Sequence, residues 1–275
     1  IGVRLVGSEM CIRDRYEDFE EEYDNIVNGL KEAARMIFEK QNMTISYTGK
    51  EEAPEFMKAE VESVIEGLYE DQKQGEKVKV TCTKSNEGFA TAGGVQYVAC
   101  AGNFKDAGLE YTGALKVLQM IFSYEYLWIQ IRVKGGAYGC MCSFSDQGDS
   151  MFVTYRDPNL SESYKVYDEA ADYVADFDAD DRDMKKYIIG TISNIDRPMN
   201  PAAKGDRSMN LYMNHVSQEM IRTERSQILH AAQEDIRALA AVVEAMLKAE
   251  QICVIGSEEK IEEEKEMFLE VKTLF

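Results

Sequence analysis

The chain has 275 residues, of which 45% are apolar and only four are proline, so its composition is that of a globular protein with one large domain or two smaller ones. Its formal net charge of −19 argues against nucleic acid or an anionic membrane surface as a partner, because phosphate contacts require an excess of Lys and Arg. We therefore predict no nucleic-acid partner and no membrane partner.

The cysteines and the longest apolar stretch indicate a cytoplasmic protein. The six cysteines are scattered along a long chain, which is not the pattern of a disulfide scaffold, so we expect reduced and mostly buried thiols. The apolar stretch from Gly113 to Ile131 contains Lys116 and Glu125, as a buried or amphipathic helix does and a membrane span does not.

The N-terminal residues 1–15 resemble translated sequencing-adapter read-through, and we predict that they are a non-native artefact. They lack the basic start and long apolar core of a signal peptide. An ordinary N-terminal strand is the alternative. We therefore expect the native fold to begin at residue 16 or later.

The segment 16–77 is predicted to hold two helices and one strand. Apolar residues recur at helical spacing over 16–40, and Met43–Thr48 alternates like a short strand. A second helix is expected from Pro54 to Tyr69, with proline near its first turn. The polar run 71–77 is typical of a linker.

The remainder alternates strands and helices. Strands are predicted at Val78–Thr83 and Gly94–Ala101, with a turn at Ser85–Phe89 between them. An apolar helix from Tyr111 to Arg132 leads into a hairpin of Ala137–Phe144 and Ser150–Tyr155. Helices follow at about 161–177, 180–195, 202–217 and 219–249, then a strand at Gln251–Ile255 and a helix over 257–269. This order predicts an α+β fold, with a mixed or antiparallel sheet of about five or six strands and helices packed on one face.

A short repeat suggests two copies of one domain. Ile45–Glu52 parallels Ile252–Glu259, and the matching glycines, Gly49 and Gly256, are 207 positions apart (256 − 49). We predict that residues 16–70 are the C-terminal tail of a preceding homologous α/β domain and that 71–275 form a complete C-terminal domain. Coincidence is the alternative, because helix–strand–Gly–helix is a common unit.

The segment from Arg132 to Gly139 reads Arg-Val-Lys-Gly-Gly-Ala-Tyr-Gly and carries the main candidate site. Arginine offers a planar fork of donors and tyrosine one hydroxyl, a pair suited to stabilising a developing oxyanion. The glycines at 135 and 136 would let backbone pass close to a bound ligand. In the simpler alternative, arginine and two glycines merely end a helix.

This motif resembles the C-terminal-half motif of the pitrilysin/insulinase family of zinc metallopeptidases, presequence protease branch. Phe144–Asp149, Tyr155–Asn159 and Asn194–Pro198 are also similar to that branch. The resemblance implies homologous α/β domains in two halves, the first carrying zinc on His-x-x-Glu-His. It further implies that Arg132 holds the substrate or orients the tyrosine, and that Tyr138 donates to the oxyanion. Gly135, Gly136 and Ala137 would contact substrate.

The zinc motif itself is absent from this sequence. The two histidines, His215 and His230, each have a glutamate four residues later, Glu219 and Glu234, so each pair could lie on one helix face. Surface or buried polar contacts are the simpler interpretation, and we predict that this chain binds no metal. Zinc is expected in the full-length enzyme, on an N-terminal half of the same polypeptide.

Two further clusters have simple structural explanations. Cys140 and Cys142 are predicted to face the same side of a strand as Tyr138, either as a redox or metal pair or, more simply, as small core residues. The aspartates between 176 and 183 lack the glycine and terminal glutamate of a calcium loop, which favours helix capping.

The function predicted is that of the C-terminal, non-zinc-binding part of a zinc metalloendopeptidase that degrades short unstructured peptides in a closed chamber. Its partners would be the zinc-binding half and a peptide substrate, and the isolated chain would be inactive. The alternative is a non-catalytic scaffold or a peptide-binding subunit of the same fold.

Overall fold

The computed structural model describes residues 18–50, 52, 54–70 and 86–274. The predicted artefact at 1–15, the linker at 71–77 and the strand Val78–Thr83 lie outside these residues. The described residues divide into two compact units. One takes in 18–70 and Met199–His215, and the other takes in 86–198 and 216–274.

The first unit is helical. It contains α2 (Phe19–Ile37), a 3₁₀ turn (Lys40–Asn42), α3 (Glu55–Glu66) and α8 (Pro201–Met213). Backbone bonds from Lys40 N to Tyr69 O and from Tyr69 N to Phe38 O join the end of α2 to the end of α3. Proline precedes α3 and opens α8, where its missing N–H costs nothing.

The predicted strand Met43–Thr48 is wrong, because these residues form neither helix nor strand. Within the described residues of this unit, the only β pairing is the single bridge between Glu39 and Tyr69, so the alternating segment has no ladder to join. The repeat is thus not mirrored in secondary structure, because Ile252 and its neighbours do lie in a strand. The division into 16–70 and 71–275 stays a prediction.

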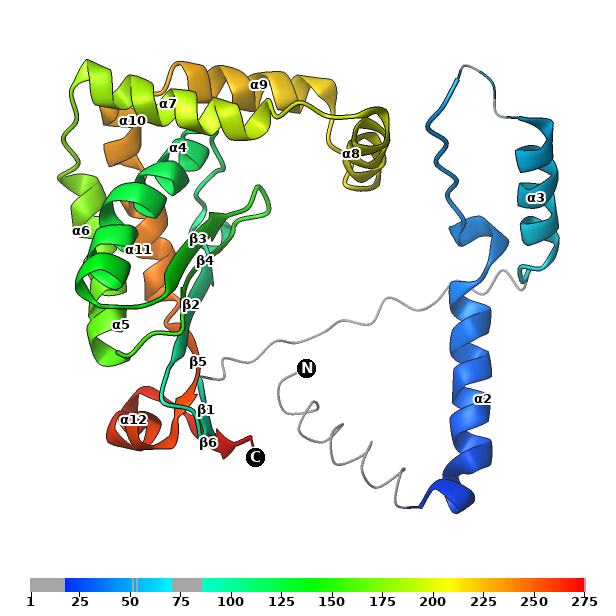
Figure 1. The fold of residues 1–275 in the computed structure, drawn as a ribbon, viewed down its shortest axis with the longest axis horizontal. Coiled ribbons are helices and arrows are strands. Elements are labelled where there is room, and N and C mark those ends of the chain that lie inside the picture. The colour runs from blue at the N-terminus through cyan, green and yellow to red at the C-terminus, as the bar shows by residue number, and fades with distance from the viewer. Residues whose placement is uncertain (1–17, 51, 53, 71–85, 275) are drawn as a thin grey trace. The chain divides into compact units, whose positions relative to one another are not determined.

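The second unit contains a mixed sheet of six strands in the order β3-β4-β2-β5-β1-β6, which confirms the predicted fold class (Figure 1). β1 runs parallel to β5 and β6, and the remaining pairs are antiparallel. The strands are β1 (Glu87–Thr91), β2 (Tyr97–Asn103), β3 (Gly139–Phe144), β4 (Asp149–Tyr155), β5 (Gln251–Ser257) and β6 (Glu270–Thr273).

Strand β1 lies where a turn was predicted, and β6 was not foreseen. The glycine that indicated a turn, Gly88, is needed for packing, because a Cβ there would come within 3.0 Å of the Ile261 and Phe268 side chains. Pairing with strands on both sides outweighs the low β-propensity of glycine. These partners are about 165 to 185 residues away in sequence, beyond the reach of local pattern.

The helices of this unit cover one face of the sheet (Figure 1). Alternate residues of β2, β4 and β5 are buried beneath them, while the residues between are partly or fully exposed. Several predicted long helices are broken, as at Glu169 and Leu239. The helices are α4 (Ala114–Ile121), α5 (Ser161–Asp168), α6 (Ala170–Ala175), α7 (Asp181–Ile195), α9 (Gln218–Leu229), α10 (Gln233–Ala238), α11 (Ala240–Lys248) and α12 (Glu258–Glu263).

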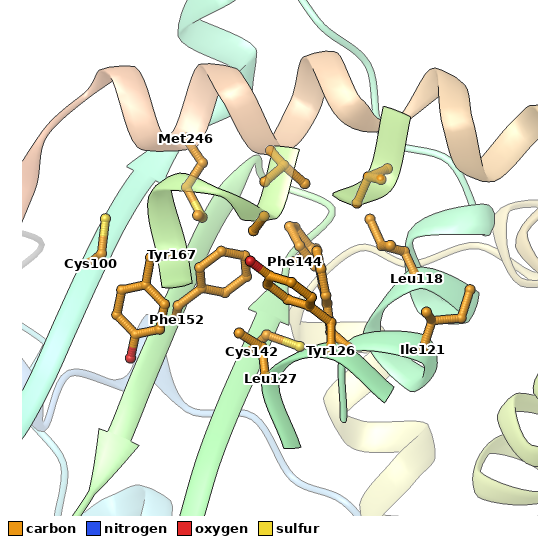
Figure 2. Close-up of a cluster of buried hydrophobic side chains, with 14 of the residues drawn as sticks. Cys100, Leu118, Ile121, Tyr126, Leu127, Cys142, Phe144, Phe152, Tyr167 and Met246 are labelled. Atoms are coloured by element: carbon orange, nitrogen blue, oxygen red, sulfur yellow. The ribbon is translucent and has the colours of Figure 1, made fainter. Parts of the chain in front are cut away.

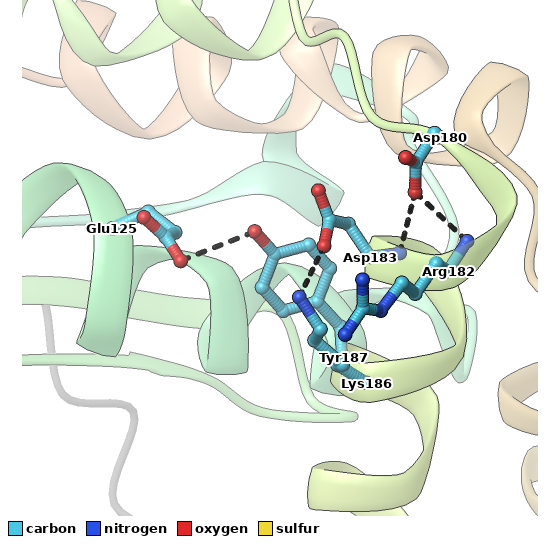
Figure 3. Close-up of polar contacts among 6 residues, drawn as sticks. All are labelled: Glu125, Asp180, Arg182, Asp183, Lys186 and Tyr187. Carbon is cyan, nitrogen blue, oxygen red and sulfur yellow. Dashed lines mark hydrogen bonds and ion pairs between the residues drawn. The ribbon is translucent and has the colours of Figure 1, made fainter.

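Helix α7 begins as the aspartate cluster predicted. The Asp180 carboxylate accepts hydrogen bonds from the backbone N–H groups of Arg182 and Asp183, which confirms a capping role for this aspartate (Figure 3). Farther along, the Tyr187 hydroxyl donates to Glu125 at 3.2 Å and ties α7 to the helix that follows α4.

Aromatic side chains form the centre of the core between the helices and the sheet (Figure 2). Phe122 is fully buried, and its ring lies 5.3 Å from that of Phe152 and 6.4 Å from that of Phe144. These contacts fix the apolar helix against β3 and β4, and so fix where that helix ends.

We expect Phe122→Ala to lower the free energy of unfolding by about 3–5 kcal/mol, because it leaves a cavity among packed rings. Tyr124→Ala, two residues away on a side chain that is 64% exposed, should change it by less than about 0.5 kcal/mol. Urea denaturation of both variants measures the difference. Equal losses would contradict the packing assigned to Phe122.

Candidate functional site

The candidate site begins where the apolar helix ends. After α4 the helix continues as π-helix through Phe122–Tyr126 and Trp128–Lys134, and Gly135 N donates to Gln130 O at 3.0 Å across the wider turn. Gly136 then takes a left-handed conformation (φ 82°) and its N–H bonds to Arg132 O. The glycines therefore do end the helix, as the simpler interpretation required. π-Helical turns are rare and often accompany functional sites.

The three predicted substrate-contact residues differ in access. Gly136 is exposed, and Gly135 is partly exposed with its carbonyl already accepting from Asn159 Nδ2 at 2.7 Å. Ala137 is buried, and its N–H bonds to Ile131 O. Its side chain and N–H are thus unavailable to a ligand. Gly136 is the most exposed of the three, although its N–H is likewise taken, by Arg132 O.

The structure brings the two predicted donors together. Tyr138 is 64% exposed, and the Arg132 guanidinium carbon lies 5.8 Å from its ring centroid. The same guanidinium lies 4.2 Å above the ring of Trp128, one turn earlier on the helix. Cation–π contacts of this kind stabilise by about 0.5–1 kcal/mol at exposed sites. Arg132 is therefore held between two rings.

Aromatic rings continue from Tyr138 across the exposed face of the sheet. The ring of Tyr155, at the end of β4, meets Tyr138 edge-on with centroids 5.8 Å apart, and Tyr97 of β2 meets Tyr155 in the same way at 5.4 Å. The Arg156 guanidinium carbon lies 5.6 Å from the Tyr155 centroid. Sequence reasoning did not select Trp128, Tyr97 or Arg156 for the site. The spacing of Trp128 four residues before Arg132 was the available signal.

A second loop holds the helix end in place. Tyr138 N donates to Arg156 O at 3.2 Å, and Asn159 Nδ2 reaches Gly135 O. Between them the fully buried Asp157 accepts from Asn159 N at 3.0 Å and from Ser163 Oγ at 2.7 Å. Burial raises the pKa of the Asp157 carboxyl, and these hydrogen bonds act in the opposite direction.

The cysteines beside this turn are core residues. Burial raises the pKa of Cys140 to about 11 and that of Cys142 to about 12, so both thiols stay protonated at neutral pH. Cys142 packs beneath the helices (Figure 2). The Tyr138 ring, by contrast, lies against Tyr155 on the exposed face. The predicted common face with Tyr138 is therefore wrong for Cys142. The strand begins only at Gly139, and the preceding turn reorients the tyrosine.

Neither histidine–glutamate pair lies within one helix. His215 follows the end of α8 in a left-handed conformation, and His230 follows the end of α9, so the assumed i, i+4 geometry does not apply. Throughout the described part of the chain, no group of three or more His, Cys, Asp or Glu could hold a metal ion. Nor does any helix there have the length and apolarity needed to cross a bilayer.

Comparison with known proteins decides the family. Residues 86–258 match the model of the PreP C-terminal domain, which is more than half of the chain. The chain belongs to this family. It is 41% identical over 255 residues to Protein HypA of Clostridium perfringens, and 29% identical over 261 residues to presequence protease 1, chloroplastic/mitochondrial, of Arabidopsis thaliana. The alignments cover 93% and 92% of this chain but only 26% and 24% of the relatives, so the chain spans about a quarter of their length.

The fold is also that of a solved peptidase domain. The structure of the peptidase M16 inactive domain from Pseudomonas fluorescens aligns with a TM-score of 0.51 at 14% identity, over 74% of this chain and 51% of the other. The resemblance predicted from the Arg132–Tyr138 motif is thus confirmed at the level of family and fold. Residues 86–258 correspond to the C-terminal domain of that family.

The comparisons correct the predicted cytoplasmic location. The relatives named as presequence proteases carry mitochondrial or chloroplastic/mitochondrial locations in their names. Scattered, reduced cysteines are equally compatible with those compartments. The cysteine pattern therefore could not distinguish an organellar location from a cytoplasmic one.

We expect Gly136→Ala to lower the free energy of unfolding by about 1–2 kcal/mol, because an L-residue pays that much to adopt the left-handed conformation. A steric clash does not cause this loss, because the atom nearest to an added Cβ is 3.7 Å away, on Pro158. Gly94→Ala is the matched control: it has open space and no positive φ, and should stay within about 0.5 kcal/mol. Thermal or urea unfolding that ranks the two variants equally would refute this reason.

Proposed function

We propose that this chain is the C-terminal, non-zinc-binding part of a zinc metalloendopeptidase that degrades short unstructured peptides in a closed chamber. The family and the names of the relatives support proteolysis. The observation that carries the proposal is the exposed pair Arg132 and Tyr138. Arg132 lies in the last turn of the helix, and Tyr138 follows the glycine turn that ends it.

Each residue of the pair has a distinct task. The Tyr138 hydroxyl donates a hydrogen bond to the oxygen of the scissile carbonyl as negative charge develops there. Arg132, steadied over Trp128, holds a substrate carbonyl or orients the tyrosine. Gly136 presents backbone without a Cβ, so a peptide can approach closely.

The zinc chemistry belongs to another part of the polypeptide in this proposal. Zinc bound to a His-x-x-Glu-His segment supplies a nucleophilic water and polarises the substrate carbonyl. That segment lies on an N-terminal half, the proposed partner, and residues 16–70 are the tail of the domain that precedes the complete C-terminal domain 71–275. The share of the relatives that this chain covers, about a quarter, leaves ample length for such a half.

We expect Tyr138→Phe to lower kcat of the full-length peptidase by about 10²–10³-fold, because it removes one oxyanion donor and leaves the ring in place. Tyr124→Phe, also exposed and in the same unit, is the control and should leave kcat unchanged. Hydrolysis of a fluorogenic unstructured peptide measures both. The 275-residue chain alone should cleave nothing, and zinc-dependent cleavage by it would overturn the proposal.

The alternative of a non-catalytic scaffold or peptide-binding subunit makes a different prediction about the gene. We expect the DNA upstream of this coding segment to continue in frame into a His-x-x-Glu-His motif several hundred residues earlier. Sequencing the locus settles the matter. A complete reading frame without that motif would favour the scaffold and contradict the peptidase.

A further inference from the structure

Arg132 and Arg156 are two exposed arginines of the second unit. Within the described residues, neither Arg132 nor Arg156 makes an ion pair, although the sequence has 50 acidic and 31 basic residues. Arg225, by contrast, makes two hydrogen bonds to Asp196, and Arg237 lies 3.6 Å from Asp178. Arg182, Arg197 and Arg222 also lack an ion pair among the described residues, so Arg132 and Arg156 are distinguished by their place on one aromatic patch rather than by being unpaired.

Both guanidiniums lie on one strip of aromatic rings. Arg132 lies against Tyr138, Tyr138 meets Tyr155 edge-on, and Arg156 lies against Tyr155, with successive separations of 5.8, 5.8 and 5.6 Å. Hydrogen bonding to the Tyr97 hydroxyl raises the pKa of the Arg156 guanidinium. The rings hold the two cations on the same exposed patch, and they offer flat apolar surface between them.

The backbone directs Arg156 outward at a cost. Its φ of 49° is left-handed, a conformation that non-glycine residues adopt at a penalty and that recurs at functional sites. The next residue, Asp157, turns fully inward, and its carboxylate is occupied by Ser163 and Asn159. The nearest acid in sequence is therefore withdrawn from the surface, and Arg156 stays available to a ligand.

We propose that Arg156, beside the ring of Tyr155, forms a binding site for a carboxylate of an extended peptide that runs along the aromatic rings toward Arg132. This deepens the proposed function and rests on it, since the carboxylate would anchor a peptide whose reacting carbonyl lies at Arg132 and Tyr138. The carboxylate is the peptide's C-terminus or an acidic side chain. Arg156 is a specificity-determining residue in this scheme.

The test measures binding of matched peptides to the 275-residue chain by fluorescence anisotropy. One unstructured peptide without Asp or Glu is made with a free C-terminal carboxylate and with a C-terminal amide, and a third version is the amide with one internal Glu. We expect wild-type chain to bind the free acid about fivefold more tightly than the amide, the upper range for one exposed ion pair. Recovery of tight binding by the Glu-containing amide would assign the site to acidic side chains. If the Glu-containing amide binds as weakly as the plain amide, the site recognises the C-terminal carboxylate.

Substitutions at Arg156 test whether the preference for a carboxylate comes from this site or from the overall charge of the chain. In Arg156→Gln, the free acid or the Glu-containing amide should bind no more tightly than the plain amide, so the ratio of their affinities falls to about one. Arg156→Lys keeps the positive charge and should keep that ratio above one. Arg182→Gln removes one exposed positive charge on α7 and should leave the ratio as in wild type. Far-UV circular dichroism confirms that each variant is folded.

Three results would overturn the inference: no peptide binds, the three peptides bind alike, or Arg182→Gln lowers the ratio as much as Arg156→Gln does. The readout is independent of catalysis. If the full-length protein hydrolyses no peptide while Arg156→Gln abolishes carboxylate preference in the binding assay, the peptidase proposal fails and the carboxylate site stands.

Discussion

The contact between the helix end and the loop after β4 fixes the geometry on which the site depends. Tyr138 N bonds to Arg156 O, Asn159 Nδ2 bonds to Gly135 O, and the buried Asp157 organises the loop from within. Net contributions of such bonds are about 1 kcal/mol each, but losing one partner of a buried group costs about 1–3 kcal/mol. The two segments therefore hold each other, and each supplies one arginine and one tyrosine of the aromatic strip.

The core explains why this contact forms where it does. Phe122, Phe144 and Phe152 lock the apolar helix against the hairpin of β3 and β4, so both ends of that hairpin lie at fixed distances from the helix. The π-helical turns shift the register of side chains before the helix stops at Gly135. Trp128 and Arg132 then share one side of the helix, and the guanidinium rests on the indole.

Sequence alone predicted the sheet class, the helix-to-hairpin order and the proximity of Arg132 and Tyr138, because these follow from local periodicity and from a compact motif. It missed β1 and β6, whose pairing partners lie about 165 to 185 residues away in sequence. It also placed a strand at Met43–Thr48, where none of the described residues pairs with it. The sequence also did not indicate the residues that surround Tyr138 on the aromatic strip. Tyr97, Tyr155 and Arg156 become neighbours of Tyr138 only through strand pairing and a left-handed residue, neither of which periodicity reveals.

Exposure sets what the site can do in this chain alone. Tyr138 is 64% exposed and Arg132 is also exposed, so a ligand here would share both donors with water. In bulk water two unit charges 4 Å apart interact by only about 1 kcal/mol, against about 4 kcal/mol at the effective dielectric of a protein surface. A donor that contributes about 2.7–4 kcal/mol to a transition state must therefore be covered when it acts. Arg132 and Tyr138 are already held in place by Trp128, Tyr155 and the loop at Asp157. In the role proposed for them, a second protein surface would therefore have to exclude water rather than align the donors.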